Sequence, residues 1–264
     1  MRLTVIVVIA VFLITCMFDV DDRKTDDDVN VAAYYQMGLG NSIAASVVLY
    51  LFRSVYPSSP LYIHWDADHA PLMSGADLIT YNKNEIDKSA NNHGLYFASV
   101  TAMDAYIKRI KRAANLQKNG WVLLLEDDVW VLSRIQQKDL RYDISGICGS
   151  RFYTQCRECP TVIQMHSRHH RLFRNASCYG GCGGNYINSS RILRLEGYHD
   201  LLRDLLNAVG GPVASDMLLS SVILADGGTI GDNPGFYEPG DLPHGPPNIL
   251  HQMKLFYFIN YILH

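Results

Sequence analysis

The chain has little net charge, no internal repeat and no low-complexity tract. Its 264 residues carry a formal charge of only −3, so no basic surplus is available to neutralise a phosphate backbone, and nucleic acid is not an expected partner. The chain also lacks the glycine spacing of a dinucleotide fingerprint and of a P-loop, which excludes both phosphate-binding loops. Hydrophobic residues make up 48% of the chain, and we expect residues 31–264 to form a single globular domain.

An uncharged, almost wholly apolar stretch opens the chain, from Leu3 to Phe18. It is short for a helix that crosses an average bilayer, but membranes of the early secretory pathway are thinner. No small-x-small cleavage motif is obvious near Cys16–Val20, so we interpret residues 1–18 as an uncleaved transmembrane anchor, with a signal peptide as the alternative. Residues 19–30 are acidic and polar, which is typical of a stalk.

The charges around this anchor predict its orientation. Arg2 precedes it, and Asp19, Asp21 and Asp22 follow it, which favours a cytoplasmic N-terminus. We therefore expect a single-pass type II membrane protein whose domain faces the lumen of the Golgi or the endoplasmic reticulum. Secretion is the alternative.

Five of the six cysteines fall within residues 145–182, where we expect a loop-rich, cysteine-rich insert. An oxidising lumen favours disulfides between them. The spacings Cys156-x-x-Cys159 and Cys178-x-x-x-Cys182 leave a zinc site as the alternative. Two glycosylation sequons, at Asn175 and Asn188, are weak support for a secretory route because such triplets are common.

Apolar runs and turn signals predict that strands and helices alternate. Strands are expected at Val29–Gln36, Leu61–Trp65, Leu78–Tyr81 and Trp121–Leu125. Helices are expected at Asn41–Val55, at Gly94–Leu116 with a basic face that includes Arg109, at Leu201–Val209, and at Asp216–Ala225 with Ser215 as its cap. This order predicts an α/β domain with a Rossmann-like, mostly parallel sheet flanked by helices.

Three consecutive acids, Glu126-Asp127-Asp128, follow the wholly apolar strand Trp121–Leu125. Ligands of open α/β sheets bind at the carboxyl ends of the strands. Three adjacent carboxylates repel one another there and resist desolvation, and a divalent cation would remove that cost. Hard oxygen ligands favour Mg²⁺ or Mn²⁺, which also binds phosphates. The ordinary alternative is a solvated acidic turn.

Three further features follow along the chain. The segment Gly180–Gly184 contains four glycines in five residues, which lets a backbone approach a ligand closely. Asp216 lies in the first turn of a predicted helix, and His251 stands three residues before Lys254 near the C-terminus. Each has an ordinary explanation as a flexible link, an acid favoured by the helix dipole or a structural histidine.

The order of these motifs resembles that of the nucleotide-sugar-dependent glycosyltransferases of the GT-A fold. Their D-x-D motif, glycine loop, acidic motif and C-terminal histidine would correspond to Glu126-Asp127-Asp128, Gly180–Gly184, Ser215-Asp216 and His251. The resemblance spans about Val29 to Lys254. The chain departs from the pattern twice, because Glu126 stands where the family has Asp and Ser215 stands where it usually has Glu. Asp216 is then the only candidate base in that motif.

The resemblance implies a GT-A-type fold and the activity of a hexosyltransferase. Such an enzyme moves a sugar from a nucleotide-sugar donor, here a UDP-sugar, to a hydroxyl of a glycan, glycoprotein or glycolipid acceptor. It also implies that Mn²⁺ or Mg²⁺ binds the donor diphosphate, held by Asp128, Glu126 and His251. Asp216 would deprotonate the acceptor hydroxyl and give an inverted linkage.

The resemblance further implies residues that bind the donor or the acceptor. Asp127 lies within the metal motif, and Lys254 would pair with a phosphate. The glycines would let the sugars approach the backbone; they are Gly181, Gly183 and Gly184. Residues at the ends of early strands are candidates for binding base and ribose, although ordinary loop polars explain them equally well; they are Tyr34, Gln36, Asp66 and Asp68.

Two rival functions fit the same features. One is a metal-dependent phosphodiester or nucleotide hydrolase that uses the same carboxylates. A dinuclear set of histidines and aspartates would favour it, but His166, His169 and His170 lie in the insert without paired carboxylates. The other is a non-catalytic lumenal protein of the same fold that binds carbohydrate.

Overall fold

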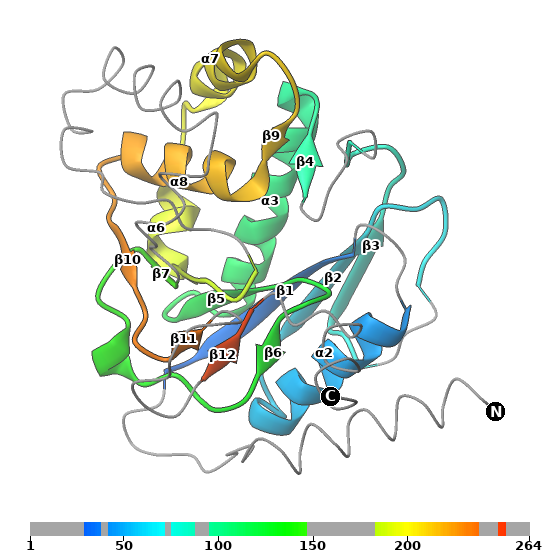
Figure 1. The fold of residues 1–264 in the computed structure, drawn as a ribbon, viewed down its shortest axis with the longest axis vertical. Coiled ribbons are helices and arrows are strands. Elements are labelled where there is room, and N and C mark those ends of the chain that lie inside the picture. Colours follow the sequence, from blue (N-terminus) through cyan, green and yellow to red (C-terminus); the bar gives the residue numbers. More distant parts are fainter. Residues whose placement is uncertain are drawn as a thin grey trace, which may run out of the picture.

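The computed structural model describes residues 29–37, 42–71, 75–87, 95–146, 183–237 and 248–251. Its main sheet has seven strands in the order β10-β7-β8-β5-β1-β2-β3 (Figure 1). These strands are β1 Val31–Met37, β2 Leu61–Trp65, β3 Leu78–Tyr81, β5 Trp121–Leu125, β7 Ile144–Gly146, β8 Tyr186–Asn188 and β10 Ile230–Asp232. The helices are α2 Ser42–Val55, α3 Val100–Leu116, η1 Gln137–Asp139, α6 Ser189–Arg194, α7 His199–Val209 and α8 Ser215–Ala225.

The sheet is mostly parallel. Strands β5, β1, β2 and β3 run side by side in one direction, and only β8 runs antiparallel to its neighbours β5 and β7. The β1–β5 register pairs Tyr35 with Leu125, so these two strands end at the same edge of the sheet. The α/β fold with a mostly parallel, helix-flanked sheet that the sequence predicts is confirmed.

Helices cover both faces of the sheet, and alternate side chains of β1 enter two different cores. Tyr34 packs in the core formed with α3, α6, α7 and α8, whereas Tyr35 packs in the core formed with α2. Figure 1 shows α2 and α3 on opposite sides of the strands. The period of two in an extended strand separates the two tyrosines in this way.

Two smaller sheets join distant segments. Strands β11 Phe236–Tyr237, β12 Ile249–Leu250 and β6 Trp130–Val131 form one of them, in which β12 runs antiparallel to β6. Strands β4 Tyr96–Phe97 and β9 Val213–Ala214 form the other, just before α3 and α8. The first sheet brings the end of the described chain back to the segment that follows β5.

Several predicted element ends are wrong. The helix expected from Gly94 begins only at Val100, because Ser99 caps it by accepting a hydrogen bond from the backbone nitrogen of Ala102, and residues before it pair as β4. Ser215 is not a cap, since it lies inside α8 and Ala214 occupies the capping position without a side-chain bond. Strand β1 covers Val31–Met37 rather than Val29–Gln36, and α7 begins at His199 rather than Leu201.

No helix in the described ranges is long and apolar enough to cross a membrane. The predicted anchor, residues 1–18, lies outside those ranges, as do residues 19–28 of the stalk and 147–182 of the cysteine-rich insert. The sequon residue Asn188 is described, and its side chain caps α6 by accepting a hydrogen bond from the backbone nitrogen of Arg191.

A buried polar network joins β1 and β2 to α3. Arg109 donates from Nε to the Tyr34 hydroxyl at 3.0 Å and forms an ion pair with Glu85. Nε2 of His64 lies 3.4 Å from the same carboxylate. Burial raises the pKa of Glu85, but the interactions with His64 and with the Arg109 charge outweigh it and lower the pKa to about 2. Arg109, which the sequence places on a basic helix face, is therefore buried because Glu85 neutralises it.

Replacing Arg109 with methionine is expected to lower the free energy of unfolding by about 3–5 kcal/mol, because the Glu85 carboxylate stays buried without its partner. Chemical denaturation measures the loss. Lys108→Met is the control, since Lys108 is 63% exposed and pairs with Asp104 at the surface, where an ion pair contributes at most about 1 kcal/mol. If both substitutions lowered the free energy of unfolding equally, burial of the Glu85–Arg109 ion pair would not explain the loss.

Candidate metal and active site

The acidic triplet forms a tight turn at the carboxyl end of β5. The backbone nitrogen of Val129 donates to the Glu126 carbonyl at 3.2 Å, and β6 starts at the next residue. The turn is thus fixed between two buried strands. Its three carboxylates lie at the edge where β1 and β5 end together, as the sequence predicts.

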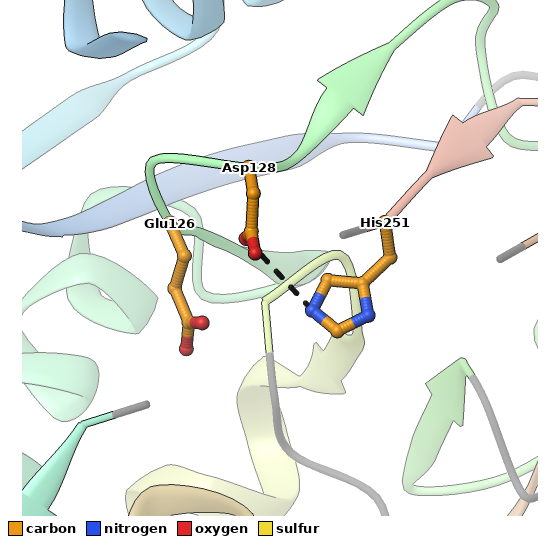
Figure 2. Close-up of side chains that lie close together, drawn as sticks. All are labelled: Glu126, Asp128 and His251. Carbon is orange, nitrogen blue, oxygen red and sulfur yellow. Dashed lines mark ion pairs between the residues drawn. The ribbon is translucent and has the colours of Figure 1, made fainter. Parts of the chain in front are cut away.

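The pairing of β6 with β12 brings His251 to this turn. In the register of β6 and β12, Trp130 pairs with Leu250, so the residue after β12 lies beside the residues before β6. Nε2 of His251 lies 4.0 Å from Oδ1 of Asp128. Figure 2 shows Glu126 and Asp128 from the turn and His251 from the end of β12 directed toward a common region.

Glu126, Asp128 and His251 each offer one ligand atom, and the three atoms lie within 4.8 Å of one another. Burial raises the pKa of Glu126 to about 8, with the Asp128 and Asp216 carboxylates adding to the rise and His251 opposing it. Two clustered, partly buried carboxylates need a compensating positive charge. Two oxygen ligands and an imidazole nitrogen suit a divalent cation such as Mn²⁺ or Mg²⁺, so the residues present fit the predicted metal.

Asp127 takes no part in this cluster. Its Oδ1 accepts a hydrogen bond from the hydroxyl of Tyr35 on β1. Burial raises the pKa of Asp127, and the Tyr35 hydrogen bond acts against that rise. The triplet therefore divides into two acids that face His251 and one that is attached to the neighbouring strand.

The glycine loop is joined to the same strand end. The backbone nitrogen of Gly184 donates to the Leu124 carbonyl at 2.7 Å. A Cβ on Gly183 would lie 2.6 Å from Val129 and 2.9 Å from Cβ of Glu126, so only glycine leaves room for Glu126. The predicted roles of Gly183 and Gly184 in binding sugars remain predictions, and Gly181 lies outside the described residues.

Replacing Gly184 with alanine is expected to destabilise the fold by about 1–3 kcal/mol, as a non-glycine residue held in a left-handed conformation does. Its φ is +85°, and a Cβ there would lie 2.6 Å from Phe236 and 2.8 Å from Ile249. Thermal unfolding measures the loss. Gly211→Ala is the control because a Cβ there meets nothing within 4 Å and its φ is not positive. No difference between the two variants would contradict the structural role of Gly184.

Asp216 also approaches the cluster, although it lies far away in the sequence. The β4–β9 pairing and a hydrogen bond from the Ser215 nitrogen to the Leu95 carbonyl, 2.9 Å long, fix the first turn of α8. Asp216 accepts a hydrogen bond from the Met217 nitrogen at 2.8 Å. Its charge contributes to the raised pKa of Glu126, so the predicted base and the predicted metal ligands share one region.

The residues predicted to bind base and ribose have different surroundings. Tyr34 and Gln36 are buried and hydrogen-bonded to each other. Asp66 is buried and accepts from the Glu85 backbone nitrogen at 2.9 Å. Asp68 is 65% exposed and pairs with Lys83. Their binding roles remain predictions, and Lys254 lies outside the described part of the chain.

Among solved structures, this arrangement is similar to that of a galactosyltransferase, LgtC, in complex with donor and acceptor sugar analogs. The similarity covers 84% of this chain and 87% of that chain, with a TM-score of 0.50 and 11% sequence identity. The chain has the GT-A fold. No family model and no curated protein sequence matches it. At this identity the similarity establishes the fold, and the activity has to be argued from the residues of the chain itself.

The sequence did not predict two features in and around the site. One is the hydrogen bond from Tyr35 to Asp127, and the other is the buried pair of Glu85 and Arg109 beneath Tyr34. A signal for the first exists, because Tyr35 ends up next to the last residue of β5 if β1 and β5 are aligned by their apolar runs. No sequence signal indicates the second, since Glu85 lies outside any periodic segment.

Proposed function

We propose that the protein is a metal-dependent glycosyltransferase that transfers a sugar from a UDP-sugar to a hydroxyl acceptor with inversion. The observation that carries this proposal is the meeting of Glu126, Asp128 and His251 at the carboxyl edge of the sheet. The GT-A fold supports it, as does the binding of donor and acceptor sugar analogs by the similar galactosyltransferase. A hexose is the proposed sugar.

Asp128, Glu126 and His251 are proposed to hold Mn²⁺ or Mg²⁺ against the donor diphosphate. When bound, the cation offsets the negative charge that develops on the leaving phosphate oxygen. The partly buried position of Glu126 strengthens this interaction because charges interact more strongly where water is partly excluded. Lys254 is proposed to pair with a phosphate oxygen.

Asp216 is proposed as the general base. The acceptor oxygen attacks the anomeric carbon of the donor sugar, the bond from that carbon to the diphosphate oxygen breaks, and Asp216 takes the hydroxyl proton. Attack opposite the leaving group inverts the anomeric configuration. The charge of Asp216 acts on Glu126, which supports a base and metal ligands that act on the same donor sugar.

A nucleotide-binding experiment tests the donor and the metal together. UDP is expected to raise the melting temperature of the protein in the presence of Mn²⁺ and to have no such effect after chelation. UDP-sugars are then screened in the same way, and the product is analysed with a carbohydrate acceptor. Stabilisation that is independent of the metal would contradict the proposed metal site.

The same assay separates transfer from hydrolysis and from simple carbohydrate binding. Within the described ranges, Glu126, Asp128 and His251 form the only group suited to a metal ion, which is a mononuclear set and does not favour a dinuclear hydrolase. Release of free sugar without a glycoside product would indicate hydrolysis. Donor binding with neither product would indicate a binding protein.

We further propose that residues 1–18 anchor the protein in a membrane of the early secretory pathway, with the catalytic domain in the lumen. At least one disulfide is then expected among the five cysteines of residues 148–182, because these cysteines are dense and the lumen is oxidising. Peptide mapping without reduction detects it. Five free thiols in protein from that compartment, or stoichiometric zinc, would contradict the disulfide.

A further inference from the structure

Tyr35 is buried, yet its hydroxyl reaches the acidic turn. The side chain has no exposed surface and lies in the core between the sheet and α2. A buried phenol hydroxyl needs an acceptor, and this one donates to Oδ1 of Asp127. The acceptor is a carboxylate, so the hydrogen bond is charge-assisted and stronger than one between neutral groups.

The hydrogen bond restrains the middle of the turn, while other bonds restrain its ends. Tyr35 pairs with Leu125 in the sheet, so its ring lies next to the residue from which the turn departs. The Val129–Glu126 backbone bond closes the turn, and the pairing of β6 with β12 fixes its exit. Within the described ranges, the Tyr35 bond is the one that acts on the side chain between the two metal-facing acids.

We infer that Tyr35 is a positioning residue for the metal site: by holding Asp127 against β1, it keeps Glu126 and Asp128 directed toward His251. This inference rests on the proposed function, because it assumes that these three residues bind a metal ion. It adds a residue that touches neither the metal nor the sugars.

The physical reason is repulsion within the turn. Three adjacent carboxylates separate when they are free to move, and separation of Glu126 from Asp128 would spread ligand atoms that now lie within 4.8 Å of each other and of His251. The Tyr35 hydroxyl gives Asp127 a fixed position away from its neighbours. A cation then binds to ligands that are already in place and causes little reorganisation.

Tyr35→Phe removes the hydroxyl and leaves the ring in the core. We expect the affinity for Mn²⁺ alone, measured by electron paramagnetic resonance, to fall about tenfold, as is typical when a partner of a metal-site residue is removed. Tyr56→Phe is the matched control. Tyr56 lies in the same core and accepts a buried hydrogen bond from the nitrogen of Ile135, a residue outside the turn Glu126–Val129, at 2.8 Å.

Both variants should lower the melting temperature of the metal-free protein to a similar degree, but only Tyr35→Phe should weaken Mn²⁺ binding. Asp127→Ala should also weaken it, because the turn then has no side-chain bond to β1, and adding Tyr35→Phe to Asp127→Ala should cause no further loss, because the two residues act as a unit. The Mn²⁺ affinities are compared for folded protein only. The double-variant result can therefore be interpreted even if a single variant is only marginally stable.

Two results would overturn the inference alone: unchanged Mn²⁺ affinity in Tyr35→Phe, or an equal loss in Tyr56→Phe. Losses that simply add in the Tyr35→Phe, Asp127→Ala variant would do so too, because Tyr35 would then act independently of Asp127. A wild-type protein that binds no Mn²⁺ would instead overturn the metal site itself, and the inference with it.

Discussion

Replacing Asp128 with asparagine is expected to abolish Mn²⁺-dependent donor binding and to leave the fold intact. The substitution keeps the size of the side chain and removes the charge from the acid that lies 4.0 Å from His251. Partners of metal ligands typically contribute 10–100-fold to metal affinity, so a ligand itself should contribute more than about 100-fold. Calorimetry of UDP binding at fixed Mn²⁺ measures the loss.

Asp200→Asn is the matched control for this experiment. Asp200 is 88% exposed on α7 and pairs only weakly with Arg203 across one helical turn, so its charge can be removed with little effect on stability or binding. Wild-type UDP affinity in Asp128→Asn with Mn²⁺ present would exclude Asp128 as a ligand. Loss of affinity together with loss of the folded state would be structural and would not support the assignment.

The long buried strands could be predicted from sequence because burial on both faces demands a continuous apolar run. Leu61–Trp65 and Trp121–Leu125 are such strands and are confirmed to the residue. Leu78–Tyr81 is also confirmed to the residue, although it is a partly exposed strand at the edge of the sheet. The two-residue strands β6 and β12 could not be predicted from sequence, since two residues are too few to show a periodic pattern. They form because they pair with each other, which depends on the tertiary fold.

The candidate site was predicted by the order of its motifs and not by any local pattern. Asp128 and His251 are 123 positions apart, and their approach depends on the register that pairs Trp130 with Leu250. Tyr34 and Tyr35 are identical in type, and only the face of β1 on which each lies decides that Tyr35 reaches Asp127 and Tyr34 reaches Arg109. Side-chain direction in a strand follows from the register, which the sequence alone left open.

Replacing Asp216 with asparagine is expected to lower turnover by about 10²–10⁴-fold, the usual contribution of a positioned base. The affinity for UDP in the presence of Mn²⁺ should not change, because Asp216 would contact the acceptor hydroxyl and not the diphosphate. Steady-state kinetics on folded protein measures the turnover, and the anomeric configuration of the product tests inversion.

Two other roles for Asp216 predict different results. If it only accepts the hydrogen bond from Met217 in the first turn of α8, its loss would cost about 1 kcal/mol of stability and leave turnover near normal. If it acts only through its charge on Glu126, the variant would lower the pKa of Glu126 and change the pH dependence of Mn²⁺ affinity. Asp226→Asn, at the opposite end of α8, controls for loss of a charge on that helix. If Asp216→Asn is slow but has normal Mn²⁺ affinity, and the wild-type product is inverted, general base catalysis remains the role of Asp216. A wild-type product with retained configuration would exclude that role.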